Sequence, residues 1–375
     1  MKERSDGFMP RYVEKNTGAA VAGVCAKVLA CVLTFAAVLV LTVFLMVKII
    51  CATSEASRNT FVTTVLETGQ MKFLASAFLP DDVIKAAVDS NSMKTFEEKE
   101  VNEGLITVPE FEGGQSVVGS SGEDSDEIEI IDIPGLTYKA TMMIVKNPAR
   151  VSLATICTGN DTWPEKGITL EEMVQRTGAL AAINGGLYNS TNNSGGSPYG
   201  VVVSNGEIVR NRPQDAGGLV LIGLSDTNIL HIVDVAGMSA SECEEMIKER
   251  GIRDAVCFQE EASVDNNHFV QLIINGKSRE ISGAGSGLNP RTAIGQRADG
   301  ALLLLVTDGR GYKGHTGASA ADLIEIMTNY GAVNAANLDG GSSTCMYYDG
   351  EYLQNSVTFY YSQSSWRLPC AFIVT

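Results

Sequence analysis

The chain has 375 residues, of which 45% are hydrophobic and 19% are charged, and its formal net charge at neutral pH is −16. This length allows one large domain with accessory segments, because a single core usually stops growing near roughly 250–300 residues. A surface this acidic repels phosphate backbones, which argues against nucleic acid as a partner. An anionic substrate has to be met by a local group of cations or backbone N–H groups.

A stretch of twenty residues without a charged side chain, 28–47, is bounded by Lys27 and Lys48. As a helix rising ~1.5 Å per residue it extends over about 30 Å, the thickness of a bilayer's hydrocarbon layer. A cleaved signal peptide is the alternative, but its apolar region is usually shorter and is followed by small residues. Basic residues precede the stretch. This pattern predicts a single-pass membrane protein with a cytoplasmic N-terminus and an extracytoplasmic C-terminal domain.

The chain contains eight cysteines, and three of them lie in or beside the apolar stretch. The other five cannot all pair within one monomer, and their spacing shows no CxxC or CxxH pattern. The sequence therefore indicates neither a zinc site nor a complete disulfide framework. Buried structural thiols are expected instead.

The composition changes again near residue 133. Residues 55–91 have a weakly helical pattern, and residues 97–132 hold twelve acidic residues, a single lysine and a Gly/Ser-rich stretch, which is typical of a solvated spacer. Short apolar runs separated by turn residues follow. We therefore predict a cytoplasmic tail (1–27), a transmembrane anchor (28–50), a stalk with an acidic linker (51–132) and a folded domain (133–375).

The folded domain is predicted to be a mixed α/β (α+β) fold, with a twisted, largely antiparallel mixed sheet flanked by helices. Its apolar runs predict strands at 138–145, 151–156, 180–183, 201–204, 219–222, 229–235, 255–258, 269–274, 292–295, 301–307, 333–338, 345–348 and 370–374. Four Asn-Gly or Asp-Gly turns predict hairpins at Asn205, Asn275, Asp299 and Asp349. Helices are predicted after Thr169, Ser239 and Ser319, and the last of them forms a strand–helix–strand crossover over 301–338.

Three glycine-rich polar clusters directly follow or precede predicted strands, where a scaffold presents loops to a substrate. They are 184–188, 289–295 and 337–344, and a fourth cluster lies at 307–310. Consecutive glycines let backbone N–H groups converge on an anion, although Gly-Gly after a strand is more often a tight turn. The candidate substrate-binding residues in and beside these clusters are Gly185, Gly186, Arg310, His315, Gly340, Gly341, Ser342 and Ser343.

Four further polar residues are candidates for the chemistry. Arg291 offers a planar fork for a phosphate, with a surface ion pair as the alternative. Asp308 and Asp339 end the two strands that flank the predicted crossover helix, so they are expected at one edge of the sheet, where paired carboxylates suit glycosidic cleavage or a divalent cation. Asn184 precedes a Gly-Gly pair. Strand-end aspartates that only cap turns are the alternative.

Taken in order, these motifs resemble the phosphodiester glycosidase family, which includes the lysosomal-pathway uncovering enzyme and bacterial proteins labelled exopolysaccharide-associated. The resemblance covers about residues 133–375. The segments that carry it are 138–139, 142–151, 182–188, 196–206 (GSPYGVVVSNG), 289–295 (NPRTAIG), 306–310, 317–323 and 335–343 (ANLDGGSS).

The resemblance implies hydrolysis at the anomeric carbon of a sugar-1-phosphate diester, which releases free sugar and a phosphomonoester. Arg291 and the backbone of 340–343 would stabilise the leaving phosphate, Asp339 or Asp308 would stabilise the oxocarbenium-like centre or activate water, and Asn184 would orient a sugar hydroxyl. No cofactor is implied with certainty, and a divalent cation remains open. The expected partners are a phosphate-linked glycan and the membrane.

Two other functions are compatible with the same motifs. One is a non-catalytic envelope protein that holds phosphate-bearing glycans during exopolysaccharide or cell-wall assembly. The other is a phosphodiesterase that breaks the P–O bond, and it differs by releasing sugar phosphate instead of free sugar.

Overall fold

The computed structural model describes residues 17–68, 71–98, 100–111, 127–358 and 364–375. The chain divides into two compact units, Met1–Glu55 and Ala56–Thr375. The Gly/Ser-rich stretch of the predicted linker, residues 113–125, lies outside the described residues.

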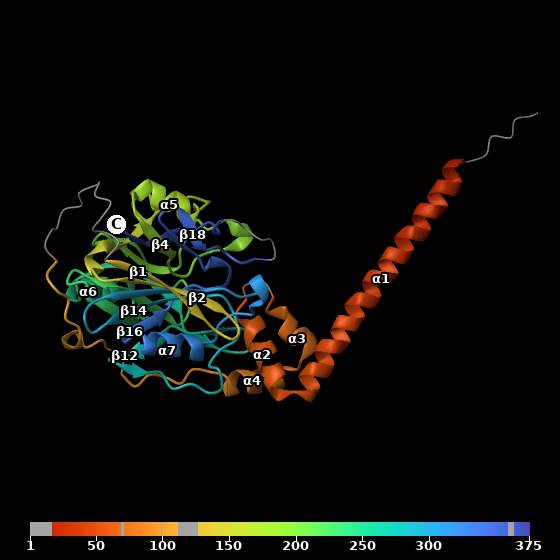
Figure 1. Cartoon of the computed structure of the whole chain (residues 1–375), viewed down its shortest axis with the longest axis horizontal. Helices are drawn as coiled ribbons and strands as arrows, with labels where there is room; N and C mark the ends of the chain where they lie inside the picture. The colour runs from red at the N-terminus through yellow and green to blue at the C-terminus, as the bar shows by residue number, and fades with distance from the viewer. Residues whose placement is uncertain (1–16, 69–70, 99, 112–126, 359–363) are drawn as a thin grey trace, which may run out of the picture. The chain divides into compact units, whose positions relative to one another are not determined.

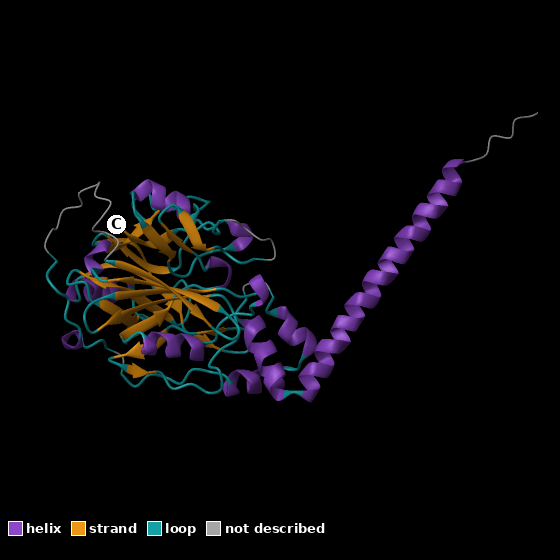
Figure 2. Cartoon of the chain, viewed as in Figure 1, coloured by secondary structure: helices purple, strands orange, loops and turns teal. Residues whose placement is uncertain are grey.

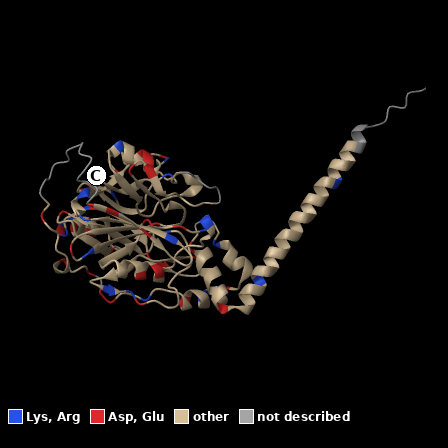
Figure 3. Ribbon diagram, viewed as in Figure 1, with Lys and Arg blue, Asp and Glu red and all other residues tan. Residues whose placement is uncertain are grey.

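The first unit contains a single long helix, α1 (Thr17–Thr53). Between Val21 and Thr53 it is long and apolar enough to cross a membrane, and none of the residues in its apolar 18-residue window is buried by the rest of the protein. The predicted span 28–47 lies within this helix, and Figure 3 shows how few charged residues the helix contains. A signal sequence near the N-terminus has the same properties.

The second unit is built from three antiparallel sheets and a two-stranded ribbon (Figures 1 and 2). The seven-stranded sheet has the order β1 (Ile128–Pro134), β2 (Lys139–Val145), β15 (Leu302–Thr307), β14 (Arg291–Arg297), β16 (Ala332–Asn337), β12 (Gln271–Ile274) and β13 (Lys277–Ser278). The second sheet has the order β18 (Glu351–Gln354), β17 (Met346–Tyr348), β4 (Ala181–Asn184), β19 (Cys370–Val374) and β3 (Val151–Thr155). The third has the order β6 (Glu207–Arg212), β5 (Gly200–Ser204), β9 (Ile252–Gln259), β7 (Leu219–Ser225) and β8 (Leu230–Asp234). The ribbon pairs β10 (Glu261–Ala262) with β11 (Asn267–His268).

The inner faces of the three sheets share one hydrophobic core, to which Met143, Ile183 and Val256 each contribute from a different sheet. Each sheet also buries part of its outer face under one helix. Helix α7 (Ala320–Asn329) covers the seven-stranded sheet, α5 (Leu170–Thr177) the second sheet and α6 (Ala240–Glu249) the third. Because both faces are covered, strands such as β15 are apolar throughout and do not alternate.

The fold class predicted from sequence is confirmed, and so is each of the thirteen predicted strands. All four predicted turns connect paired strands: β5 with β6, β12 with β13, β14 with β15 and β17 with β18. All strand pairs among the described residues are antiparallel. The single mixed sheet expected from the pattern is therefore three sheets around a common core.

The predicted crossover is also present. Helix α7 leads from β15 to β16, and these two strands lie on either side of β14, antiparallel to it. They are therefore parallel to each other and end at the same edge of the sheet. Both residues that follow them, Asp308 and Asp339, reach that edge for this reason.

The segment predicted as a stalk folds into the second unit. Helices α2 (Glu55–Leu66), α3 (Phe73–Phe78) and α4 (Asp81–Ser90) bury a small apolar cluster that includes Val62, Leu66 and Ile84. The apolar residues of these helices are spaced to form this cluster. The helices are short, however, and their sequence does not show that they pack against one another.

The acidic segment that follows is held against the domain. The backbone N–H groups of Lys94 and Thr107 donate to the carbonyls of Glu280 (2.9 Å) and Ala298 (2.8 Å). Strand β1 then begins at Ile128, five residues before the predicted boundary. It is an edge strand that carries two exposed acidic residues, Glu129 and Asp132, and these concealed it within the acidic run.

Candidate functional site

The glycine-rich clusters meet at one edge of the seven-stranded sheet, next to the end of β4. Strand β14 begins at Arg291, which pairs with Thr307 at the end of β15, and β16 ends beside the same strand. The loops after β15 and β16 both contact Pro290: a Cβ on Gly309 would lie 3.0 Å from its nitrogen, and one on Gly340 would lie 2.9 Å from its carbonyl oxygen. These close approaches explain why glycine follows each aspartate.

Asp339 lies at the centre of this edge. Part of the residue reaches solvent, yet its carboxylate lies within a dense shell of protein atoms, and this burial raises its pKa from 3.8 to about 7. Hydrogen bonds from the Ser343 hydroxyl and the Gly340 N–H, together with the charge of Arg310, oppose the increase. A carboxyl group with a pKa near neutrality can accept or donate a proton at physiological pH.

Arg310 lies across the turn that follows Asp339. Its Nη1 donates to Ser342 Oγ at 2.6 Å and to the Val357 carbonyl at 3.3 Å, and the residue is exposed to solvent. Gly341 has a φ of +63°, and a Cβ there would lie 2.5 Å from the second guanidinium nitrogen. The positive φ favours glycine at position 341, and a side chain there would have to displace the Arg310 guanidinium.

Asn184, at the end of β4, connects the second sheet to the Asp339 turn. Its Nδ2 donates to the Asp339 carbonyl at 2.7 Å, while its Oδ1 accepts from Thr292 Oγ1 at 2.7 Å and from the Cys345 N–H at 3.2 Å. The side chain is fully buried, with 1% of the residue exposed. These bonds make Asn184 a residue that positions the turn, and they leave its amide oxygen engaged within the protein.

Asp308 is also engaged within the protein, although it lies at the predicted edge. Its Oδ1 accepts the Lys139 N–H at 2.7 Å, and its Oδ2 is 2.7 Å from His315 Nδ1. Asp308 is 2% exposed, whereas 29% of the His315 side chain is exposed. A buried carboxylate that fixes one imidazole nitrogen orients the other one outward. His315 therefore presents Nε2 to solvent from the loop after β15.

Arg291 is buried and does not face solvent. Its guanidinium forms an ion pair with the buried Glu67, donates to the Gly287 carbonyl (2.6 Å), Ser286 Oγ (3.1 Å) and the Ala318 carbonyl (3.1 Å), and lies 4.9 Å from the ring centroid of Phe269. The alternative considered from sequence was a surface ion pair. The pair is instead a buried one. Its partner Glu67 comes from the segment before the predicted domain and also accepts the Gly287 N–H at 2.7 Å.

The glycines of the first cluster serve packing. A Cβ on Gly186 would lie 2.3 Å from the Cys257 carbonyl, and one on Gly185 would lie 3.1 Å from the Cys370 carbonyl. These two glycines let the loop after β4 pass close to β9 and β19. The structure thus brings Asn184, Arg310, Asp339 and Ser343 together, with the Asp308–His315 pair on the neighbouring loop.

One residue of the site was not selected from sequence. Tyr188 is buried, and its hydroxyl is hydrogen-bonded to Ser343 Oγ at 3.0 Å. Burial, followed by the nearby Asp339, raises the pKa of Tyr188 well above its usual value. Tyr188 ends the segment 184–188 that was singled out, so its position in the cluster was the available signal.

Metal ligation was left open by the sequence. Within the part of the chain that the structure describes, no group of three or more His, Cys, Asp and Glu side chains is placed to hold a metal ion. The cysteines outside α1 are mostly buried, and burial raises the pKa of Cys257 to about 12 and that of Cys243 to about 11. A protonated, buried thiol is a poor ligand and nucleophile, consistent with packing as the role of these cysteines.

Comparison with known proteins gives three findings. The family described as phosphodiester glycosidase matches residues 177–375. An uncharacterized SPbeta prophage-derived protein of Bacillus subtilis, YomE, is 40% identical over 67 residues, which are 18% of this chain and only 10% of that protein. The catalytic domain of zebrafish N-acetylglucosamine-1-phosphodiester alpha-N-acetylglucosaminidase, auto-inhibited by its pro-peptide, is 18% identical with a TM-score of 0.49 over 66% of this chain and 81% of that one.

The matched region begins in α5 and ends with β19. It contains Asn184, Arg310, Asp339 and Ser343, the residues that the structure gathers at the sheet edge. It covers more than half of the 375 residues. The chain therefore belongs to the phosphodiester glycosidase family.

Proposed function

We propose that the chain is a membrane-anchored hydrolase that cleaves the glycosidic bond of sugar-1-phosphate diesters outside the cytoplasm. The observation that carries the proposal is the Asp339 carboxyl, which has a pKa of about 7 and lies near the guanidinium of the solvent-exposed residue Arg310. A group that exchanges protons at neutral pH next to a group that binds phosphate is what this reaction requires.

The reaction breaks the bond between the anomeric carbon and the phosphate oxygen. The electron pair leaves with the oxygen to give a phosphomonoester, and water adds to the carbon to give the free sugar. A phosphate is already a stable anion, so stabilising its developing charge matters more than protonating it. We assign this role to Arg310, since the guanidinium of Arg291 is enclosed with Glu67.

We assign to Asp339 either the removal of a proton from the attacking water or the stabilisation of the oxocarbenium-like centre. Asn184 is assigned to hold the Asp339 turn through the hydrogen bond to its carbonyl. His315 lies on the adjacent loop and is assigned to substrate binding through Nε2, with Asp308 positioning it. These proposed roles differ from the catalytic roles that the motifs suggested for Asn184, Asp308 and Arg291.

The test is incubation of the full chain in detergent with a panel of sugar-1-phosphate diesters, following free sugar, sugar phosphate and phosphomonoester. Wild type should release free sugar, and Asp339→Asn or Arg310→Ala should lower kcat/KM by about 100-fold or more. Arg297→Ala is the matched control, because Arg297 is a half-buried arginine that pairs with Asp299 at the other end of β14.

The other functions predict other products. Binding of the diesters without turnover across the panel would support a protein that holds phosphate-bearing glycans in exopolysaccharide or cell-wall assembly. Sugar phosphate as the product would show cleavage of the P–O bond. Either result contradicts the proposed reaction.

We also propose that α1 anchors the chain with the Ala56–Thr375 unit on the extracytoplasmic side. The apolar length of α1 and the basic residues before it support this orientation. The protein should stay in the membrane pellet after carbonate extraction, and the folded unit should be accessible to protease added outside intact cells. Full-length protein in the carbonate supernatant would contradict the anchor.

A further inference from the structure

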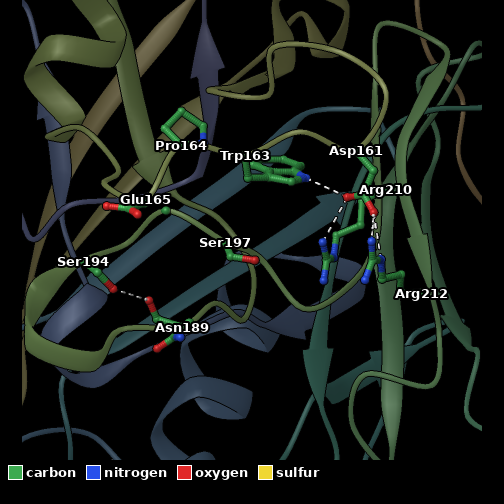
Figure 4. Close-up of a pocket in the computed structure, with 10 residues that line it drawn as sticks. Asp161, Trp163, Pro164, Glu165, Asn189, Ser194, Ser197, Arg210 and Arg212 are labelled. Atoms are coloured by element: carbon green, nitrogen blue, oxygen red, sulfur yellow. Dashed lines mark hydrogen bonds and ion pairs between the residues drawn. The ribbon is translucent and has the colours of Figure 1, made fainter.

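A cavity lies between the loops that follow β3 and β4 of the second sheet and strand β6 of the third sheet, and its lining residues play no part in the site described above. It has a volume of about 460 Å³. Figure 4 shows its walls, which are the indole of Trp163, a charged group formed by Asp161, Arg210 and Arg212, and a polar group that includes Asn189, Ser194 and Ser197. A volume of this size accommodates a small organic ring such as a sugar residue.

The walls of this cavity are fixed by the fold. Trp163 packs against the hydrophobic core and its Nε1 donates to Asp161 Oδ1 at 2.8 Å. On the other side, Gly196 approaches so closely that a Cβ there would lie 2.0 Å from the Pro164 carbonyl. The Asn189 N–H donates to the Ser197 carbonyl at 2.8 Å and closes the loop that forms this side. The cavity is therefore largely preformed, which reduces the ordering required for binding.

The charged groups at the cavity compensate one another. Asp161 accepts from Arg210 Nη1 at 3.0 Å and from Arg212 Nε at 2.7 Å, and Arg210 also donates to Asp215 at 2.6 Å. Glu165, a further lining residue, adds another negative charge. The two guanidinium groups thus face an equal or greater number of carboxylates, so the cavity offers no excess positive charge to a phosphate.

We infer that this cavity is a binding site for a neutral sugar residue of a glycan. An indole face fixed to the core provides a flat apolar surface for the C–H groups of a pyranose ring. The surrounding amide, hydroxyl, carboxylate and guanidinium groups include both donors and acceptors, which the hydroxyl groups of a sugar can use. Charge compensation at Asp161 selects against an anionic ligand.

The cavity adjoins the candidate reaction site through one loop. Asn189 lines the cavity and follows Tyr188, whose hydroxyl bonds to Ser343 beside Asp339. Glycan binding in this cavity does not depend on hydrolysis at Asp339, and it stands whether the chain cleaves its ligand or only holds it.

Tryptophan fluorescence offers a direct test, because the chain contains two tryptophans, Trp163 and Trp366. In the full chain in detergent, Trp366→Phe leaves Trp163 as the sole reporter. We expect maltotetraose, cellotetraose or chitotetraose to cause a saturable change in its emission. The same change should occur in Trp366→Phe combined with Asp339→Asn, whereas adding Asn189→Ala should weaken binding about tenfold.

Trp163→Phe is the matched control, since it leaves Trp366 as the reporter and its emission should not respond. Equilibrium dialysis of the wild-type chain with the same three tetrasaccharides keeps the test valid if Trp366→Phe does not fold. Absence of binding up to about 10 mM of each tetrasaccharide would overturn the inference. So would loss of binding in Asp339→Asn, which would place the sugar at the reaction site, or a clear preference for glucose 6-phosphate, which would show an anion site.

Discussion

At the scale of single residues, the surroundings of Asp339 determine its protonation state. The equivalent side chain in an exposed loop would be ionised at neutral pH, whereas here burial brings the pKa to about 7. Sequence placed an aspartate at the end of a strand, but its neighbours Arg310, Ser343 and Tyr188 come from loops that are distant in the chain or across the turn. Its protonation behaviour therefore depends on the assembled site.

This raised pKa predicts how stability varies with pH. Because the folded state holds the Asp339 proton more tightly than the unfolded state does, the resulting stabilisation is full below pH 3.8 and is lost as the pH rises through about 7. Asp339→Asn cannot ionise, so it should be more stable than wild type at pH 8, by on the order of 1–2 kcal/mol after allowing for partial exposure. At pH 4 the two proteins should be similar.

The measurement is thermal or urea unfolding of both proteins at pH 4, 6 and 8. A variant that is less stable than wild type at pH 8 would contradict the raised pKa. In the activity assay, wild-type kcat/KM should rise with pH through about 7, since the proposed role requires the ionised carboxylate.

Gly341 and Gly350 form a matched pair for testing the position of Arg310. Both have positive φ angles, +63° and +87°, but a Cβ on Gly350 meets open space, whereas one on Gly341 meets the Arg310 guanidinium. Each substitution by alanine should lower stability by about 1 kcal/mol through backbone strain. Only Gly341→Ala should also lower kcat/KM, because it displaces Arg310.

Urea unfolding and the diester assay on the two variants separate these effects. Equal losses of activity in Gly341→Ala and Gly350→Ala would mean that strain alone is responsible. Equal and unchanged activities would remove Arg310 from the proposed mechanism.

At the scale of elements, α7 determines where the two aspartate loops lie. It begins with a capping box in which Ser319 accepts the Asp322 N–H and Asp322 accepts the Ser319 N–H. The helix joins β15 to β16, so its start and its packing on the sheet set the relation between the loops at residues 308 and 339. The same kind of box, Ser239 with Glu242, starts α6 on the third sheet.

The two capping boxes offer a controlled comparison. Ser319→Ala and Ser239→Ala should each lower the free energy of unfolding by about 1 kcal/mol, because each leaves helix N–H groups without their partner. Ser319→Ala should also reduce kcat/KM, whereas Ser239→Ala should not. The measurement is urea unfolding together with the diester assay, and a loss of activity in Ser239→Ala would show that the effect is only a general loss of stability.

Local signals were sufficient to predict these elements. The capping residues Thr169, Ser239 and Ser319 each begin a helix, and the Asn-Gly and Asp-Gly turns each connect paired strands. Caps and tight turns act within a few residues, so they can be read from sequence. The edge strand β1 carries the exposed acidic residues Glu129 and Asp132, which hid it within the acidic run, and it was missed.

At the scale of the whole molecule, the segment before the domain is part of its folded structure. Glu67 is buried against Arg291 and also accepts from Asn267 Nδ2 (3.1 Å) and Asn289 Nδ2 (3.2 Å). The two charges satisfy each other in a site closed to water. The sequence did not predict this contact, because Glu67 and Arg291 are 224 positions apart in the chain.

This buried pair predicts strong coupling. Arg291→Ala and Glu67→Ala should each destabilise the chain by about 3–5 kcal/mol, because each leaves one uncompensated buried charge. The double variant should lose much less than the sum, since it removes both charges. Urea unfolding of the four proteins completes the cycle, with the exposed pair Lys94–Glu280 as the control, for which coupling should be below about 1 kcal/mol.

Additive effects of Arg291→Ala and Glu67→Ala would show that the pair does not form. A stable Arg291→Ala protein that has lost only diester hydrolysis would return Arg291 to the phosphate-binding role first expected from its motif.

The sequence by itself determined the family, the fold class, the apolar helix, the hairpins and the helix starts. These follow from patterns within short stretches of sequence, or from the order of motifs along the chain, which can be recognised without knowing the fold. It also placed Asp308 and Asp339 at one edge, because a crossover makes its two strands parallel.

Only the tertiary structure decided which polar groups stay accessible. It enclosed Arg291 with Glu67, engaged Asn184 and Asp308 in internal hydrogen bonds, and left Arg310, His315 and part of Asp339 exposed. Burial and hydrogen bonding depend on groups that are distant in sequence, and their energies are set by the surrounding protein. For this reason the residues that the motifs identified divide into buried ones that hold the site and ones that stay accessible to solvent.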